Sequence, residues 1–206
     1  MITTISNSNL IAIINHLGAE LISLRTKEKK EYIWEGNPKF WGKHSPILFP
    51  IVGTLKNNTY LFNGVEYHLS RHGFARDMEF TLAEKKENSV TLSLESNSET
   101  LLHYPFEFEL QIQYTLEDAT LEINYCVINK SDNRFPFSIG AHPAFALPGN
   151  FEDYTLAFEK IEPLEYTLLE NDLVSSQTEI IESNNIHIDH LLLQKWCLIR
   201  FNIIKR

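Results

Sequence analysis

The sequence predicts an all-β protein, a large antiparallel β-sandwich formed by one domain over residues 1–206. Apolar and polar side chains alternate along residues 106–116, which is the pattern of a half-buried strand. The pair Asn63-Gly64 separates two short apolar runs and is typical of a two-residue hairpin turn. No 3.6-residue periodicity continues long enough to predict a major helix. A chain of 206 residues is also long enough to bury one substantial core.

The individual strands are predicted from short apolar runs bounded by turn-forming or charged residues. They cover residues 10–14, 18–24, 32–34, 60–62, 65–69, 78–83, 89–95, 106–116, 121–128, 155–158, 165–169 and 191–201. Residues 99–104 are expected to form a short helical turn that ends at Pro105. The apolar run 47–53 is expected to be partly irregular, because Pro46 and Pro50 cannot donate to a central ladder.

The charge balance argues against a nucleic-acid partner. Acidic residues number 27 against 18 basic residues, and the net charge of −9 leaves no dominant basic face. No apolar run approaches the length of a bilayer span. The first residues lack the basic and apolar regions of a signal peptide. We therefore expect a cytoplasmic protein with no membrane partner.

The two cysteines, Cys126 and Cys197, lie far apart in apolar, strand-like surroundings. They are expected to be reduced, buried thiols rather than a disulfide. The sequence contains no CxxC pair and no spacing typical of a zinc site.

The segment 71–77 (RHGFARD) is the strongest candidate for a functional site. It places two guanidinium groups and one imidazole within six residues, with Gly73 breaking regular structure between them. A second histidine lies far downstream in the segment 140–145 (GAHPAF), and we expect His72 and His142 to face each other across one pocket. Taken alone, His72 is better explained as a loop imidazole that caps a backbone carbonyl.

The residue types indicate acid-base chemistry on an oxygen-rich ligand. His142 precedes a proline, which favours an extended backbone, and an imidazole with an ordinary pKa of about 6.5 suits proton transfer near neutral pH. Arginines bind polar oxygen atoms through paired donors. Trp41, Phe74 and Phe145 suit the apolar faces of sugar rings, although each fits a hydrophobic core equally well. Serine-nucleophile motifs, phosphate-binding glycine loops and HExxH helices are absent from the sequence.

Three blocks of the sequence occur in a recognisable order: residues 40–53 (FWGKHSPILFPIVG), 71–77 (RHGFARD) and 140–145 (GAHPAF). Together they resemble the aldose 1-epimerase (galactose mutarotase-like) superfamily, and most closely its LacX-like branch. The resemblance implies the β-sandwich often called a supersandwich, with a sugar-binding cleft on one concave sheet. It also implies a small-molecule sugar or sugar phosphate as the partner and no metal or organic cofactor.

The resemblance further implies roles for individual residues. A histidine in the position of His142 acts as general acid on the ring oxygen. A histidine and an arginine in the positions of His72 and Arg76 hold the sugar, or a phosphate in the hexose 6-phosphate branch, and Arg71 and Trp41 are further candidates for binding. A glutamate near the C-terminus takes the proton from the anomeric hydroxyl. The ring then opens to the aldehyde, rotates about C1–C2 and closes as the other anomer.

The chain departs from the family pattern in two places. Many relatives carry arginine where this chain has Thr54, and Lys56 is the nearest substitute. Relatives also continue beyond the last residue, so the fold is expected to be incomplete at the C-terminus and to lack the glutamate base. The segment 186–190 resembles the approach to a sugar-binding aspartate, which makes Asp189 a candidate ligand.

Three interpretations remain open on the sequence alone. The first is an isomerase that interconverts the α and β anomers of an aldose or a hexose 6-phosphate. The second is a catalytically impaired carbohydrate-binding remnant of such an enzyme, for which Glu152, Asp153 and Asp189 are the nearest substitutes for the base. The third, a metal-dependent isomerase with the two histidines as ligands, is disfavoured because no third ligand is close in sequence.

Two further expectations concern charge and assembly. Four basic residues either form a positive rim that favours an anionic sugar or are ordinary surface charges paired with Asp77 and Glu79. The sequence predicts the two arrangements equally. The rim residues are Arg71, Arg76, Lys43 and Lys56. An incomplete sandwich would also leave a sheet edge unpaired, which predicts a homodimer through that edge.

Overall fold

The computed structural model describes residues 1–158, 164–183, 185–189 and 197–199. It confirms the all-β prediction, because strands dominate these ranges and α1 (Ser98–His103) is the single α-helix within them. The chain divides into two compact units, Met1–Ala146 and Leu147–Arg206. That both belong to one domain stays a prediction.

The first unit is built from antiparallel strands. They are β1 (Ile2–Ser6), β2 (Leu10–Asn15), β3 (Glu20–Thr26), β4 (Ile47–Leu48), β5 (Thr59–Phe62), β6 (Val65–His68), β7 (Thr81–Lys85), β8 (Ser89–Glu95), β9 (Phe108–Glu117), β10 (Thr120–Asn129) and β11 (Gly140–Ala141). They form sheets in the orders β1-β2-β3, β10-β9-β8-β7, β5-β6 and β11-β4. The 3₁₀ turns η1 (Lys56–Asn58) and η2 (Ala75–Asp77) precede β5 and β7.

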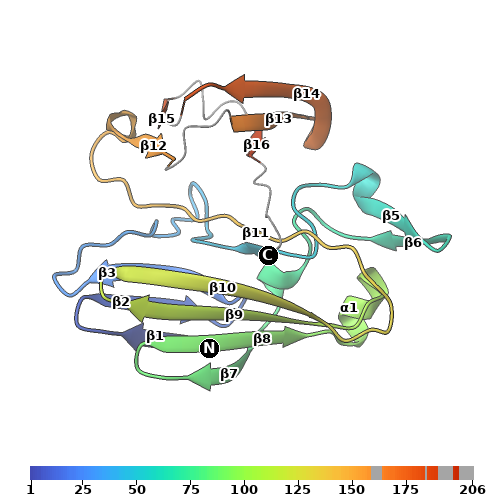
Figure 1. Cartoon of the computed structure of the whole chain (residues 1–206), viewed down its shortest axis with the longest axis horizontal. Coiled ribbons are helices and arrows are strands. Elements are labelled where there is room, and N and C mark those ends of the chain that lie inside the picture. Colours follow the sequence, from blue (N-terminus) through green and yellow to red (C-terminus); the bar gives the residue numbers. More distant parts are fainter. Residues whose placement is uncertain (159–163, 184, 190–196, 200–206) are drawn as a thin grey trace. The chain divides into compact units, whose positions relative to one another are not determined.

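The core of this unit lies between the two larger sheets, which face each other in Figure 1. Residues of β9 alternate between buried and half-buried, as the sequence pattern predicts, so one face of the strand enters the core. Phe49, which precedes a cis proline, is fully buried, and its ring centroid lies 5.2 Å from that of Phe108 on β9. The segment around Phe49 is therefore packed into the core of the sandwich.

Local sequence signals account for several elements. Asn63 and Gly64 both have positive φ, at 51° and 79°, as a type I′ hairpin between β5 and β6 requires. α1 falls where a helical turn was expected, and the Asn97 side chain caps it by accepting from the N–H groups of Glu99 and Thr100. β8 covers the predicted residues 89–95.

Two strand predictions need correction. Residues 32–34 form no continuous strand, and in this region only isolated bridges join Arg25 to Glu31 and Ile33 to Phe145. The reason is that the Glu31 carboxylate accepts from backbone N–H groups that a ladder would use, including those of Leu24 and Ile33. β7 begins at Thr81 rather than at residue 78, because η2 ends only at Asp77 and Glu79 forms an isolated bridge with Leu17 instead of joining the sheet.

The prediction that Cys126 is buried is wrong. Cys126 is a free, exposed cysteine, because it lies opposite Gln111 on the outward face of the four-stranded sheet. The side chain of Cys197 lies outside the described part of the chain.

The second unit also consists of antiparallel strands. They are β12 (Thr155–Ala157), β13 (Leu164–Glu170), β14 (Leu173–Ile181), β15 (Asn185–His187) and β16 (Cys197–Ile199), and η3 (Phe151–Asp153) precedes β12. β12 pairs with β15, and β13 lies between β14 and β16. Of the strand predicted over residues 191–201, only β16 falls within the described residues. No helix in the described ranges is long and apolar enough to cross a membrane.

Candidate functional site

The segment 71–77 is held by a close crossing with the buried backbone of Phe49. The Phe49 carbonyl accepts from the N–H groups of Phe74 and Ala75, and the Phe49 N–H donates to the His72 carbonyl. Gly73 has φ +71°, and a Cβ at this position would lie 2.3 Å from the Phe49 oxygen. Only glycine fits this crossing, which explains why the two arginines and the histidine stand on either side of a glycine.

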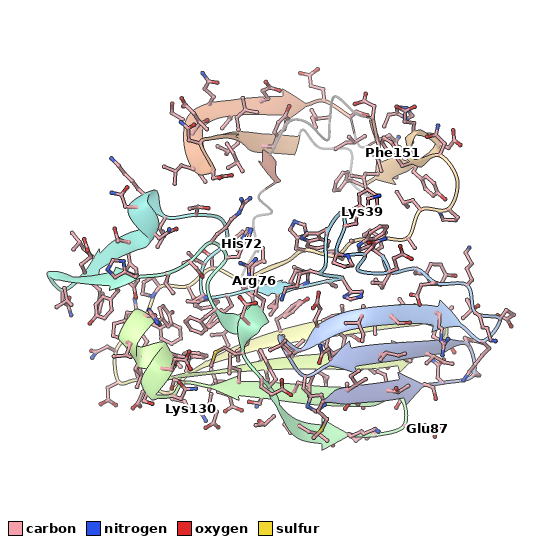
Figure 2. All side chains as sticks on the ribbon, turned by 180° about the vertical axis from the view of Figure 1, so that it is seen from behind. Lys39, His72, Arg76, Glu87, Lys130 and Phe151 are labelled. Carbon is pink, nitrogen blue, oxygen red and sulfur yellow. The ribbon has the colours of Figure 1, made fainter. Side chains whose placement is uncertain are left out.

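Arg76 is fixed from two sides. A Cβ on Gly18, in the turn between β2 and β3, would lie 2.6 Å from the Arg76 carbonyl oxygen, so the turn packs directly on η2. The Arg76 guanidinium donates from Nη2 to the Arg71 carbonyl at 2.9 Å. Figure 2 shows His72 and Arg76 close together in this segment.

The hydrogen bonds of His72 define its tautomer. The Gly53 backbone N–H donates to His72 Nδ1 at 3.0 Å, so Nδ1 is the unprotonated nitrogen of a neutral ring. The proton then lies on Nε2, where the Arg71 Nε–H also points at a separation of 3.3 Å. A neutral imidazole accepts at only one nitrogen, and the Gly53 bond is the shorter of the two. His72 accordingly presents a donor at Nε2 and does not cap a carbonyl through Nδ1.

The electrostatic environment keeps His72 neutral. Burial of the ring, followed by the positive charges of Arg76 and Arg71 and by the neighbouring His142, lowers the pKa of His72 to about 4. The same environment that disfavours a protonated imidazole also concentrates donors around it. His72 is therefore a fixed hydrogen-bond donor at neutral pH and is poorly suited to be a proton acceptor.

His142 follows β11, whose residues pair with β4. Its backbone N–H donates to the Pro46 carbonyl at 3.1 Å. His142 is exposed, and its ring centroid lies 6.5 Å from that of His72. The same centroid lies 5.0 Å from the ring centroid of Trp41, which precedes β4 in the chain. The structure thus brings the two predicted histidines together, with an indole beside them.

Trp41 is positioned by a hydrogen bond to its backbone carbonyl. The Trp34 indole Nε1–H donates to the Trp41 carbonyl at 3.0 Å, and the Trp34 N–H donates to the Ala144 carbonyl at 2.9 Å. Trp41 is half-buried, so part of its ring surface is left for a ligand. Phe74, by contrast, belongs to the aromatic core around Phe49, with ring centroids 6.4 Å apart.

The basic residues near the histidines are partly neutralised. Lys43 Nζ and Arg76 Nε lie 3.3 Å and 3.4 Å from the two carboxylate oxygens of Asp77. Lys56 is exposed on η1. Thr54 has a shielded hydroxyl with no hydrogen-bond partner in the described residues.

Asp189 belongs to the second unit, where it follows β15 and is half-buried. Glu152 and Asp153 lie in η3 of the same unit. Among the described residues, no group of three or more His, Cys, Asp or Glu side chains is placed to hold a metal ion.

Glu20 is a residue that the sequence analysis missed. It is a buried carboxylate at the start of β3, and it accepts from the backbone N–H groups of His44 and Ser45. The available signal was a glutamate between apolar residues (Ala19 and Leu21) at the start of a predicted strand, since a buried charge requires partners.

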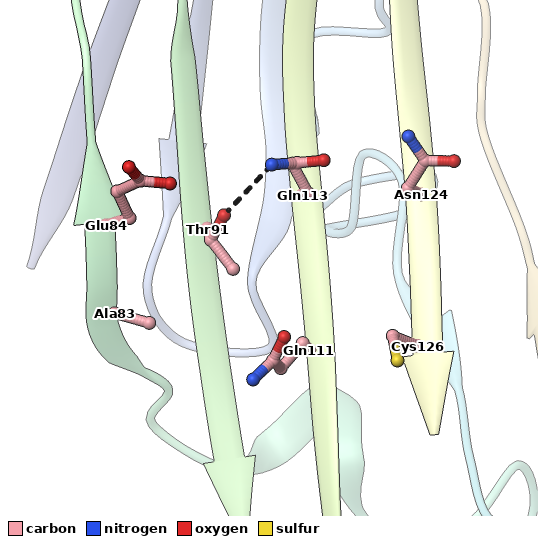
Figure 3. Close-up of a pocket in the computed structure, with 7 residues that line it drawn as sticks. All are labelled: Ala83, Glu84, Thr91, Gln111, Gln113, Asn124 and Cys126. Carbon is pink, nitrogen blue, oxygen red and sulfur yellow. Dashed lines mark hydrogen bonds between the residues drawn. The ribbon is translucent and has the colours of Figure 1, made fainter. Parts of the chain in front are cut away.

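A polar hollow of about 330 Å³ lies elsewhere, on the outward face of the β10-β9-β8-β7 sheet (Figure 3). Its lining residues are Ala83, Glu84, Thr91, Gln111, Gln113, Asn124 and Cys126. The lining contains no aromatic ring and no histidine, so it offers neither a stacking surface for a sugar nor an acid-base pair. The candidate site is therefore the region around His72 and His142.

Comparison with known proteins places the chain in a family. The family model described as aldose 1-epimerase matches residues 1–195, and the chain belongs to the aldose 1-epimerase superfamily. Within it, the chain belongs to the LacX-like branch, as it is 38% identical over 172 residues to the plasmid-encoded protein LacX of Lactococcus lactis subsp. lactis. That match covers 79% of this chain and 58% of LacX.

Solved structures agree with this placement. A galactose mutarotase related enzyme from Lactobacillus acidophilus superposes with a TM-score of 0.89 at 36% identity, over 92% of this chain and 65% of that one. A galactose mutarotase-like protein from Lactobacillus casei gives 0.86 at 36% identity, over 93% and 69%. These similarities confirm the galactose mutarotase-like β-sandwich. The chain spans less than two thirds of the length of the LacX relatives.

The protonation state of His72 can be tested directly. Its pKa of about 4 lies below the ordinary value of about 6.5, so the unfolded chain takes up the proton first as the pH falls. Stability therefore does not depend on this group above about pH 6.5, and it decreases as the pH falls from about 6.5 to about 4. An NMR titration of the imidazole should show Nε2 protonated and Nδ1 bare throughout the neutral range. A midpoint near 6.5 would contradict this description of the site.

Proposed function

We propose that this site binds an aldose and interconverts its α and β anomers, with His142 as the general acid. The observation that supports the proposal most is the pairing of the His72 and His142 rings, 6.5 Å apart, beside the half-buried Trp41. A fixed donor, a second imidazole and an indole form a surface suited to the polar edge and the apolar face of a sugar ring. Membership of the aldose 1-epimerase superfamily supports the same class of reaction.

The proposed chemistry needs two proton transfers. His142 in its protonated form gives a proton to the ring oxygen while a base removes the proton of the anomeric hydroxyl. The C1–O bond of the ring breaks as the C1 carbonyl forms, so the product is the open-chain aldehyde. Rotation about C1–C2 and closure in the reverse direction give the other anomer and restore both groups.

His72 and Arg76 have binding roles in this proposal. His72 is neutral and donates from Nε2 to a sugar oxygen, because the Gly53 N–H occupies Nδ1. Arg76 and Arg71 supply further donors next to it. Trp41 covers one face of the sugar, and Asp189 remains a proposed sugar ligand. The reaction is proposed to take place in the cytoplasm.

An alternative function is carbohydrate binding with impaired catalysis. In the first unit, the ring contacts of His142 are with Trp41 and His72, and neither of these is a carboxylate base. The carboxylates considered as substitutes, Glu152, Asp153 and Asp189, all belong to the second unit. Loss of one acid-base partner costs about 10²–10⁴-fold in rate. Polarimetry on glucose and galactose separates the two functions, since only the first gives interconversion above the spontaneous rate.

The role of His142 is tested by the substitution His142→Asn. This change removes the titratable group but keeps a polar side chain on an exposed position, so the fold should be unaffected. We expect anomer interconversion to fall by about 10²–10⁴-fold while sugar binding changes little. Rates are measured by polarimetry, and His68→Asn, at an exposed histidine of β6, is the control for loss of a histidine outside the site. Wild-type rates in His142→Asn would remove the acid assignment.

A phosphorylated sugar is proposed as a substrate on electrostatic grounds. The Arg71 Nε–H points at the His72 ring, Arg76 Nη2 donates to the Arg71 carbonyl, and Lys43 pairs with Asp77 of the same segment. Charge-assisted hydrogen bonds from guanidinium groups to a phosphate are about twice as strong as neutral ones. The competing interpretation, that Asp77 already neutralises Lys43 and Arg76, is supported by both ion pairs.

Calorimetry distinguishes these two cases. If the basic residues bind phosphate, glucose 6-phosphate will bind more tightly than glucose, and the difference will shrink as salt is added. Arg76→Gln should reduce the difference, while Lys130→Gln, at a basic residue of the outward sheet face, should leave it unchanged. Equal affinities for the two sugars at low salt would exclude the phosphate proposal.

A homodimer is proposed to form through the edge of β10. Within the described residues β10 pairs only with β9, and its inward-facing Tyr125 is 39% exposed. The opposite edge, β7, is protected by a register shift and by Lys85. Sedimentation velocity should show concentration-dependent dimers. The substitutions Asn124→Lys and Cys126→Lys, at exposed positions of β10, should reduce the dimer fraction through charge repulsion. A monomer at all concentrations in the wild-type protein would contradict the proposal.

A further inference from the structure

A buried carboxylate connects the core sheet to the segment that carries His142. Glu20 is the first residue of β3 and is only 6% exposed. Burial of a charge is costly unless hydrogen bonds satisfy it. Oε1 of Glu20 accepts from the His44 N–H at 2.6 Å and from the Ser45 N–H at 3.0 Å. Charge-assisted bonds of this length are among the stronger ones in proteins.

Residues 44–46, whose backbone N–H groups bond to Glu20, also bond to the His142 segment through their carbonyls. The His44 carbonyl accepts from the Ala144 N–H at 2.8 Å. Two residues further on, the Pro46 carbonyl accepts from the His142 N–H at 3.1 Å. The backbone from His44 to Pro46 therefore bonds to Glu20 through its donors and to the His142 segment through its acceptors.

The His142 segment has two other supports: the ladder between β4 and β11, and the bridge between Ile33 and Phe145, beside which the Trp34 N–H donates to the Ala144 carbonyl. The ladder between β4 and β11 has only two residue pairs, Gly140 with Leu48 and Ala141 with Ile47, and it ends immediately before His142. Residues 35–46 include no strand, so no sheet holds the chain just before β4. Glu20 fills this role from outside the segment.

Glu20 is itself rigidly placed. The preceding residue, Ala19, is buried, and its carbonyl accepts from the Tyr114 hydroxyl of β9 at 2.7 Å. The start of β3 is thereby tied to the central strand of the opposite sheet. Hydrogen bonds, joined by short stretches of backbone, thus connect β9 through residues 19–20 and 44–46 to His142.

We propose that Glu20 is a positioning residue for His142. Its carboxylate fixes the backbone of residues 44–46, and this backbone sets the position of the His142 ring relative to His72 and Trp41. Glu20 acts through the backbone and does not contact the sugar. The consequence for catalysis rests on the proposed function, but the positioning itself is independent of it.

The test compares three variants. Glu20→Ala removes the carboxylate that accepts from the His44 and Ser45 N–H groups. Glu20→Gln keeps one oxygen that can accept from them. Glu109→Ala is the matched control, because Glu109 also accepts side-chain hydrogen bonds, from Ser93 and Gln111, but lies on the outward sheet face. If Glu20→Ala does not fold, Glu20→Asp, with a side chain one methylene shorter, replaces it.

The first readout is amide hydrogen exchange of His142 and Ala144 by NMR, which needs no activity. Exchange at these two amides should rise in Glu20→Ala, remain near wild type in Glu20→Gln, and change in Glu109→Ala only as far as global stability changes. Unchanged exchange at both amides in a folded Glu20→Ala or Glu20→Asp protein would overturn the proposal.

The second readout is catalysis. Misplacement of a catalytic group by about 1 Å can cost about 10²-fold, so kcat for anomer interconversion should fall by about that factor in Glu20→Ala. KM should change little, and Glu20→Gln should restore most of kcat. If the wild-type protein shows no interconversion, the proposed function fails while the exchange experiment still decides the role of Glu20. A kcat loss matched by Glu109→Ala would indicate a stability effect and would count against positioning.

Discussion

The site depends on the crossing of two backbone segments at Phe49. This residue has its ring in the sandwich core and its peptide groups against the segment 71–77. The crossing leaves no space for a Cβ at Gly73, and it brings His72 beside the following segment, where Gly53 bonds to it. Hydrophobic packing of one side chain and backbone hydrogen bonding of the same residue therefore place the site on the core. A site anchored in this way is more rigid than one carried by an exposed loop alone.

A second feature is the way in which charges are arranged around a neutral imidazole. Arg71 and Arg76 lie on either side of His72, and their positive charges add to the effect of burial on its protonation. Asp77 in turn pairs with Arg76 and Lys43 instead of with the histidine. A carboxylate next to His72 would raise its proton affinity and return it to ordinary titration. The distribution of partners thus favours the neutral form of His72.

Elements with strong local signals were predictable from the sequence. β9 follows from alternation, and the β5–β6 hairpin follows from Asn63-Gly64, because both depend on near neighbours in the chain. Residues 32–34 look like a strand for the same reason but are not one, since the Glu31 side chain competes for the backbone donors. The proximity of His72 and His142 was anticipated from their sequence setting. The Gly53 and Glu20 contacts were not, because they join residues 19 and 24 positions apart and leave no periodic pattern.

The bond from Gly53 to His72 has a consequence for the choice of ligand. A backbone N–H cannot reverse its polarity, so the imidazole is locked with its proton on the side away from Gly53. Any ligand atom that meets this face has to bring a lone pair. Hydroxyl, ether and phosphoryl oxygens satisfy that condition, whereas an ammonium group, which has no lone pair and is repelled by two guanidinium groups, does not. Under the proposed function, this arrangement favours a ligand oxygen over a protonated amine at this position.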